Sequence, residues 1–161
     1  MKTVRFSIKN WADRLWVLGL TLAALVLFGV GLGDVPLRDW DEGIVAQVAR
    51  EIWRSQTGES PQAWVWLYPT INGAPYLNKP TLIHWLMAQC YAIGGVNEWT
   101  SRLPGAFLSA LAVPLLYGIG REIFSRRTPA IFAALIYLTL LPVVRHGRLA
   151  MLDGALVCFF L

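Results

Sequence analysis

Three small groups of ionisable residues occur in a chain that is otherwise apolar. The first is acidic and lies in the run RDWDEG, which contains Asp39, Asp41 and Glu42. A carboxylate within reach of a hydroxyl can take its proton and so make it a nucleophile. Acidic residues are also favoured at the start of a helix, where they cap it or interact with its dipole. Taken alone, this group favours helix capping over catalysis.

The other two groups are mainly basic. Lys79 lies in the run YLNKP, and its ammonium could bind a phosphate or extend toward lipid head groups. Arg145 and Arg148 lie in VVRHGRLAMLDG, shortly before Asp153. Because arginines at the end of an apolar helix are costly without an anionic partner, they predict either a lipid phosphate or a carboxylate beside them. Asp153 is one such carboxylate.

Metal and nucleic-acid sites are not indicated. His84 and His146 are interpreted as packing or hydrogen-bonding residues, because no His or Cys pair has the spacing of a zinc site. The few carboxylates could still bind a divalent metal. The net charge of +4 comes from bases beside apolar segments, which is typical of residues that set membrane topology and not of a surface that binds nucleic acid.

The composition indicates a membrane protein. Hydrophobic residues make up 56% of the 161 residues and charged residues 15%, whereas soluble domains carry about 25% charged residues. The run at 15–32 contains no charge and as a helix would extend about 27 Å, close to the ~30 Å hydrocarbon core. A cleaved signal peptide is the alternative, but its apolar core is typically about 7 to 15 residues long. The run is therefore predicted to be a transmembrane helix.

Two groups of bases indicate which ends face the cytoplasm. One is the leader, residues 1–14, and the other is the connection at 121–128. They contain Lys2, Arg5, Lys9 and Arg14 in the leader, and Arg121, Arg126 and Arg127 in the connection. Because cytoplasmic loops are rich in bases, an even number of crossings should separate them. The predicted crossings are 15–32 and 103–120, and a third helix at 129–149 leads outward again.

Residues 33–102 then form an extracytoplasmic loop. Residues 41–55 are amphipathic and too charged to span, so a surface helix is predicted there, with a second at 80–96. Asn72-Gly73 predicts a tight hairpin between them. The predicted fold class is all-α, in a polytopic membrane protein with interfacial helices in its first extracytoplasmic loop.

The last residues, 150–161, form a turn and the start of a truncated helix. The turn brings Asp153 to the same side of the membrane as Asp41 and Lys79. Because the final apolar run is too short to cross a bilayer, we expect an N-terminal fragment.

The order of these features along the chain carries a resemblance. An acidic pair follows the first span, a surface helix comes next, and a Lys-Pro and a carboxylate follow. The full series is Asp41-Glu42, Tyr68-Pro69, Gly73, Tyr76, Asn78-Lys79-Pro80, His84-Trp85, Ser101-Arg102-Leu103-Pro104 and Met151-Leu152-Asp153. It resembles the N-terminal part of the protein O-mannosyltransferase superfamily, with its bacterial aminoarabinose transferase relatives and their multi-spanning GT-C fold. The resemblance covers about residues 15–161.

The resemblance implies sugar transfer from a polyprenyl-phosphate donor to a lipid or protein acceptor on the extracytoplasmic side of the inner or plasma membrane. Asp41 matches the acidic residue of the first loop that positions or deprotonates the acceptor. Glu42, the next residue, is assigned to the same catalytic group. Asp153 matches the second-loop carboxylate, and Lys79 matches the base that contacts the donor phosphate.

Two positions depart from the aminoarabinose transferases. Ile44 replaces an arginine and Asn78 replaces a glutamate, so aminoarabinose specificity does not follow. Phosphate binding is therefore expected to fall on Lys79, Arg145 and Arg148, with single-displacement inversion at the sugar.

A non-catalytic membrane protein, such as a transporter or assembly subunit, is the competing hypothesis. In it these charges would cap helices and bind lipid head groups. Transporters place polar residues near the middle of the membrane, whereas here they gather at one face, which favours the enzyme. We expect the 161-residue chain to be inactive alone.

Overall fold

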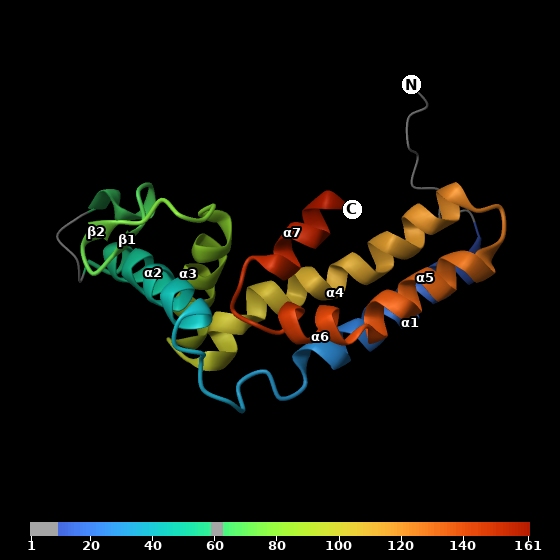
Figure 1. The fold of residues 1–161 in the computed structure, drawn as a ribbon, viewed down its shortest axis with the longest axis horizontal. Helices are drawn as coiled ribbons and strands as arrows, with labels where there is room; N and C mark the ends of the chain where they lie inside the picture. The colour runs from blue at the N-terminus through green and yellow to red at the C-terminus, as the bar shows by residue number, and fades with distance from the viewer. Residues whose placement is uncertain (1–9, 59–62) are drawn as a thin grey trace, which may run out of the picture.

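The computed structural model describes residues 10–58 and 63–161, and helices dominate it (Figure 1). The α-helices of the described residues are α1 (Trp11–Gly29), α2 (Asp41–Gln56), α3 (Leu82–Gly94), α4 (Glu98–Ile123), α5 (Arg127–Thr139), α6 (Leu141–Gly147) and α7 (Asp153–Phe160). A short 3-10 helix, η1 (Ala63–Trp66), and the strands β1 (Thr70–Ile71) and β2 (Ala74–Pro75) lie between α2 and α3. The all-α fold class is confirmed. Most of the basic leader, residues 1–9, lies outside the described residues.

Two helices, α1 and α4, are long and apolar enough to cross a membrane by length and composition. Helices α5 and α6 meet the same criterion as a pair, with a bend of 59° between them. These helices overlap the segments predicted to span, at 15–32, 103–120 and 129–149, although α1 ends at Gly29 and α6 at Gly147. Which end of each faces the cytoplasm stays a prediction.

The bend between α5 and α6 differs from the single helix predicted at 129–149. Leu140 has an extended backbone (φ −66°, ψ 115°), and Pro142 lies in the first turn of α6. Proline has no N–H to donate to the carbonyl four residues earlier, and its ring clashes with that carbonyl. Pro142 therefore prevents α5 from continuing straight into α6.

Helices α1, α4 and α5 lie side by side along the long axis of the molecule (Figure 1). Their shared core contains residues from each helix, including Leu20, Phe28, Val113, Tyr117 and Leu138. Large apolar side chains on the outer face of α1 are exposed. A helix that is apolar on both faces is typical of a membrane span packed on one side against protein.

A buried carboxylate connects these three helices at one end of the bundle. Asp13 Oδ1 accepts hydrogen bonds from the Tyr117 hydroxyl at 2.8 Å, Arg121 Nε at 3.1 Å and Arg127 Nε at 2.9 Å. Asp13 belongs to α1, Tyr117 and Arg121 to α4, and Arg127 to α5. Arg121 and Arg127, two of the bases of the connection at 121–128, thus form ion pairs with a buried acid.

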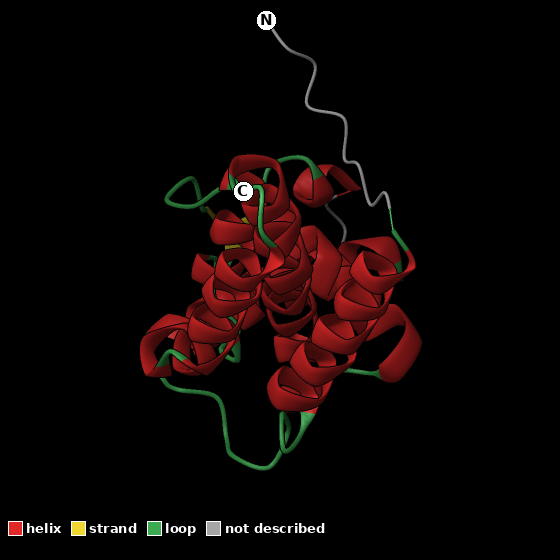
Figure 2. Ribbon diagram, turned by 90° about the vertical axis from the view of Figure 1, so that its right-hand side faces the viewer, coloured by secondary structure: helices red, strands yellow, loops and turns green. Residues whose placement is uncertain are grey.

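Helices α2 and α3 pack together at the other end of α4 (Figure 1). A cluster of buried residues joins them to α7 and includes Val45, Ile83, Met87 and Ala155. Figure 2, turned by 90°, shows helices throughout, with the short strands largely hidden behind them.

The hairpin predicted at Asn72-Gly73 is confirmed. Thr70 pairs with Pro75, and Ile71 with Ala74. Both turn residues have positive φ, 51° for Asn72 and 78° for Gly73, as the favoured two-residue hairpin turn requires.

Helix α7 approaches α4 closely through small residues. Gly154 lies so near Ser109 that an added Cβ would collide with the Ser109 hydroxyl, and an added Cβ at Gly147 would lie 2.7 Å from the same hydroxyl. Ser109 Oγ also donates to the Gly147 carbonyl at 3.3 Å. This contact holds the start of α7, and therefore Asp153, against the middle of α4.

Candidate active site

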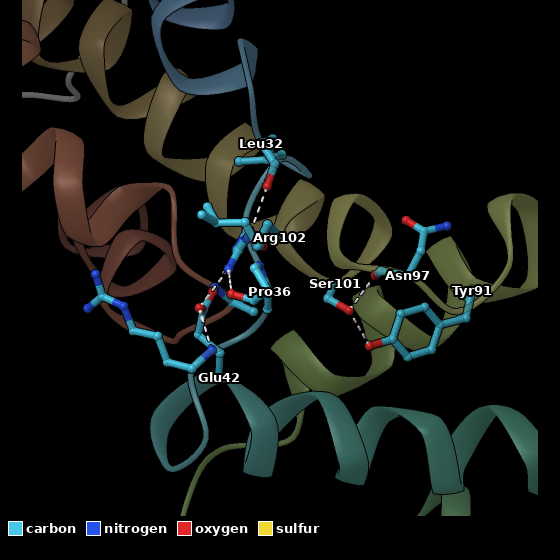
Figure 3. A network of polar contacts seen from close by, with 10 residues as sticks. Leu32, Pro36, Glu42, Tyr91, Asn97, Ser101 and Arg102 are labelled. Atoms are coloured by element: carbon cyan, nitrogen blue, oxygen red, sulfur yellow. Dashed lines mark hydrogen bonds and ion pairs between the residues drawn. The ribbon is translucent and has the colours of Figure 1, made fainter.

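A buried ion pair between Glu42 and Arg102 lies at the base of the candidate site (Figure 3). Arg102 Nε is 2.8 Å from Glu42 Oε1, and Nη2 is 2.9 Å from Oε2. The remaining guanidinium N–H groups donate to the carbonyls of Leu32, Val35 and Pro36 at 2.7 to 2.9 Å. Every nitrogen of Arg102 thus has a partner, and the segment after α1 is folded around it.

Glu42 makes two further contacts, both with backbone. Its Oε1 accepts from the Ala150 N–H at 2.7 Å and its Oε2 from the Arg38 N–H at 3.1 Å. Burial opposes ionisation, but the hydrogen bonds from Arg102, Ala150 and Arg38 outweigh it and hold the pKa of Glu42 below its ordinary value. Glu42 thereby joins the first loop, α2, α4 and the turn before α7.

Asp41 lies beside this network and has the opposite environment. It is the first residue of α2, and its side chain is exposed. Among the described residues, none bonds to its carboxylate, and Trp40 at the N-cap provides no side-chain cap. The helix dipole stabilises an acid at the first residue of a helix, which agrees with the interpretation that this acidic group caps a helix. The carboxylate is nevertheless open to a substrate, whereas that of Glu42 is fully enclosed.

One small apolar pocket is lined by sequence neighbours of Lys79 and Asp153, although neither of these two residues lines it. This pocket, of about 80 Å³, lies between α3 and α7 and is lined by Pro80 and Leu152 among others. Lys79 precedes Pro80, and Asp153 follows Leu152. The bond from the Ala150 N–H to Glu42 holds the turn before Asp153 against the start of α2, which carries Asp41. Lys79 lies in the segment before α3, and α3 packs against α2.

The segment that leads to Lys79 is anchored to α2. Glu51 accepts hydrogen bonds from the Thr70 hydroxyl at 2.5 Å and from the Asn72 N–H at 2.6 Å. Burial opposes ionisation of Glu51, but these bonds and one from Gln47 hold its pKa below the ordinary value. The hairpin, and with it the approach to Lys79, is thus attached to a helix that also carries Asp41.

His84 follows Lys79 by five residues and is fully buried in α3. Its ring lies edge-on to Tyr76, with the ring centroids 5.9 Å apart. Burial lowers the pKa of His84 to about 4, and the charge of Lys79 adds to this. The carbonyls of Pro80 and Thr81 lie near the ring, although neither ring nitrogen completes a hydrogen bond with a described residue. The imidazole is therefore neutral at pH 7.

Arg145 and Arg148 lie in a different place from Lys79. They line a cavity of about 490 Å³ together with Arg38 and Arg102, and Lys79 is not among its lining residues. Arg148 donates to the Val30 carbonyl. Within the described part of the chain, neither Arg145 nor Arg148 forms an ion pair with Asp153 or another carboxylate. Asp153 instead lines a separate cavity of about 380 Å³ that includes His146 and Ser109.

Sequence reasoning gave no role to two of the residues found here. Arg102 appeared only within the motif Ser101-Arg102-Leu103-Pro104, although an arginine beside a long apolar run already indicates a buried partner. Arg38 lies in the run RDWDEG but was not considered as part of the basic group. As to metals, no three His, Cys, Asp or Glu side chains of the described residues are grouped as an ion would require.

Comparison with known proteins gives consistent relatives. Residues 78–161, just over half of the chain, match the family described as dolichyl-phosphate-mannose-protein mannosyltransferase. An undecaprenyl phosphate-alpha-4-amino-4-deoxy-L-arabinose arabinosyl transferase of Shewanella sediminis is 31% identical over 87% of this chain and 24% of its own length. The transferase of the same name from Yersinia enterocolitica is 30% identical over 75% of this chain and 22% of its own length. The chain thus spans about a quarter of the length of these relatives.

A solved structure shows the same fold. The crystal structure of ArnT from Cupriavidus metallidurans bound to undecaprenyl phosphate matches with a TM-score of 0.74 and 24% identity, over 90% of this chain and 25% of that one. The GT-C fold predicted from the motif series is confirmed, and the chain is an integral membrane protein. On the match of residues 78–161, it belongs to the dolichyl-phosphate-mannose-protein mannosyltransferase family.

Proposed function

We propose that this chain forms the N-terminal part of a glycosyltransferase that moves a sugar from a polyprenyl-phosphate donor to a lipid or protein acceptor. The arrangement around Glu42 supports this proposal most strongly. One buried carboxylate holds together the segments that carry Asp41 and Asp153. Lys79 lies just before α3, which packs against α2. Its relatives are transferases named for undecaprenyl-phosphate-linked aminoarabinose.

In the proposed reaction, Asp41 takes the proton of an acceptor hydroxyl as the oxygen attacks the anomeric carbon of the donor. The bond from that carbon to the phosphate oxygen breaks, and the electron pair leaves with the lipid phosphate. Lys79 stabilises the charge that develops on the phosphate. A single displacement inverts the anomeric carbon. Asp153 is the second carboxylate and orients the acceptor.

The sequence analysis grouped Glu42 with the catalytic acids, but its environment favours a positioning role. It has no exposed surface, and both of its oxygens accept hydrogen bonds. To reach a substrate it would have to leave Arg102 unpaired, which costs about 3–5 kcal/mol for a buried pair. We therefore propose that Asp41 is the base, that Asp153 orients the acceptor, and that Glu42 positions the segments that carry both.

The orientation proposed is that of the sequence analysis, with a cytoplasmic N-terminus and with Asp41, Lys79 and Asp153 on the extracytoplasmic side of the inner or plasma membrane. The proposed site has no divalent metal assigned to it. Membrane lipids surround the spanning helices, and the acceptor is proposed only as a class.

The proposal is tested in the full-length polypeptide that carries these residues, reconstituted in proteoliposomes. Sugar transfer is measured from a radiolabelled undecaprenyl-phosphate sugar. Asp41→Asn and Lys79→Ala should each abolish transfer with normal membrane insertion, and Asp39→Asn, at an exposed acid two positions away, serves as the matched control. Wild-type turnover in either variant would contradict the assigned roles. Absence of transfer by the wild-type protein from any polyprenyl-phosphate sugar would favour the transporter or assembly subunit.

A further inference from the structure

Four arginines line one cavity beside the end of α1. This arginine cavity is formed by Arg38, Arg102, Arg145 and Arg148 with apolar side chains between them, and its lining contains no acid. Arginine is suited to phosphate because its planar guanidinium donates two parallel hydrogen bonds. The lining therefore has the composition of an anion site.

Three of these arginines, Arg38, Arg145 and Arg148, form no ion pair with a described residue. Arg102 is paired with Glu42, and Arg148 bonds only to the Val30 carbonyl. The side chains of Arg38 and Arg145 are exposed and make no hydrogen bond or ion pair with any described residue. The Asp34 carboxylate and the Arg148 guanidinium both lie near Gly31 at the cavity edge, but they form no ion pair. A ligand with negative charge would supply the missing partner.

The position of the cavity indicates a membrane lipid. It lies between the C-terminal end of α1 and the bent α6, at the end of two apolar segments that meet the criteria for spans. Its apolar lining residues Val35 and Leu141 are 61% and 74% exposed, and Val30 at its edge is 65% exposed. A phosphate could bind the guanidinium groups as its acyl or prenyl chain follows this apolar surface.

The arginine cavity is separate from the neighbourhood of Lys79. Lys79 does not line this cavity and lies in the segment before α3, whereas the cavity is bounded by the segment after α1 and by α6. The Glu42–Arg102 pair borders the cavity through Arg102 and reaches the turn before α7 through Glu42. Arg145 and Arg148, grouped with Lys79 by charge, thus have a location of their own.

We infer that the arginine cavity is a second anion site that binds the phosphate of a membrane lipid, in addition to a donor phosphate at Lys79. The inference deepens the proposed function and depends on it only for the role of Lys79. The phosphate is either the diester of an ordinary anionic phospholipid or the monoester of a carrier lipid. Both share the group that the guanidinium groups bind.

Binding is tested with the full-length protein in phosphatidylcholine nanodiscs that contain a photo-crosslinkable phosphatidylglycerol or a photo-crosslinkable undecaprenyl phosphate. We expect labelling of α6 or of residues 30–38 by at least one probe. Arg38→Gln and Arg145→Gln should each weaken it roughly tenfold, because each removes a hydrogen bond to a charged group. Arg126→Gln, at an exposed arginine outside the cavity, should leave it unchanged.

The probes and variants separate the outcomes. Preference for the phosphatidylglycerol identifies an ordinary phospholipid, and preference for the undecaprenyl phosphate identifies a carrier lipid; both support the site. Undiminished labelling in the Arg38→Gln, Arg145→Gln double variant overturns it. So does equal loss in Lys79→Ala, because the two locations would then be one site. Loss of transfer in Lys79→Ala with this labelling retained supports the proposed function and the second site independently.

Discussion

Glu42 and Arg102, sixty positions apart, form a two-pronged ion pair in which both side chains are almost completely buried. Such a pair is costly to desolvate, and removal of one partner is worse than removal of both. The pair contributes mainly to positioning, because it fixes the backbone on both sides of Asp41.

We predict that Glu42→Gln lowers the unfolding free energy by about 3–5 kcal/mol, because it leaves the Arg102 charge buried without a counter-charge. The double variant Glu42→Gln, Arg102→Met should be more stable than Glu42→Gln alone. Thermal melting of the detergent-solubilised protein, followed by tryptophan fluorescence, measures both. Asp41→Asn, at the exposed neighbour, is the control and should melt like the wild type. A wild-type melting temperature for Glu42→Gln would contradict the role given to the pair.

The buried His84 predicts a dependence of stability on pH. Its pKa is about 4 in the folded chain, against an ordinary value of 6.5, so the unfolded chain takes up the proton first. The unfolding free energy should be greatest above pH 6.5 and should decline as the pH falls toward 4. At about 1.4 kcal/mol for each pKa unit, the loss is on the order of 3 kcal/mol.

His84→Phe should remove this decline, since phenylalanine does not titrate and can keep the edge-on contact with Tyr76. Melting temperatures between pH 7 and pH 4 test it. His146→Phe, at an exposed histidine, is the matched control. A decline in His84→Phe as steep as in the wild type would show that other groups cause it. Glu42 and Glu51, whose pKa values are lowered, lose their contribution only below about 4.5, outside most of this range.

The contact of Glu51 with the hairpin predicts a local effect. Glu51→Gln weakens the bonds from the Thr70 hydroxyl and the Asn72 N–H by about 1.5 kcal/mol, so the Asn72 amide should exchange with solvent roughly tenfold faster. Hydrogen–deuterium exchange of the peptide that spans β1 and β2 measures this. Glu98→Gln, on α4, is the control. Unchanged exchange in Glu51→Gln would mean that the hairpin is held by packing alone.

At the other end of the bundle, Asp13→Ala should destabilise much more than Tyr117→Phe. The first substitution leaves Arg121 and Arg127 without the acid that they share and should cost several kcal/mol, whereas the second removes one hydrogen bond worth about 1 kcal/mol. Chemical denaturation in mixed micelles ranks the two. Equal effects would contradict the assignment of Asp13 as the centre of this cluster.

Helix positions were largely predictable, because they depend on local patterns. Helix α2 covers residues 41–56 and α3 residues 82–94, near the surface helices predicted at 41–55 and 80–96. Amphipathic spacing and the Gly94-Gly95 pair provide these signals within a few residues of each helix. The break at Leu140 was missed, although Pro142 was visible in the sequence, because the tolerated Pro104 and Pro114 within α4 show that proline alone does not end a helix.

The contacts of the candidate site were less predictable. The motif series selected Asp41 and Lys79, but spacing could not show that Glu42, beside Asp41, is enclosed by residues 60 and 108 positions away. Nor could charge alone show that Arg145 and Arg148 line a cavity that does not include Lys79. Both depend on how helices pack across the molecule, which single-residue patterns do not encode.

The hydrogen bond from Ala150 to Glu42 also affects the biogenesis of the protein. Residues 42 and 102 emerge from the ribosome well before residue 150, so the carboxylate cannot reach its final environment until α5 and α6 have been synthesised. Contacts this distant along a chain form late, because loop closure must come first. The first loop therefore completes its folding only after α5 and α6 are made, and an arrest of translation before α6 would leave the carboxylate of Glu42 without its contact to Ala150.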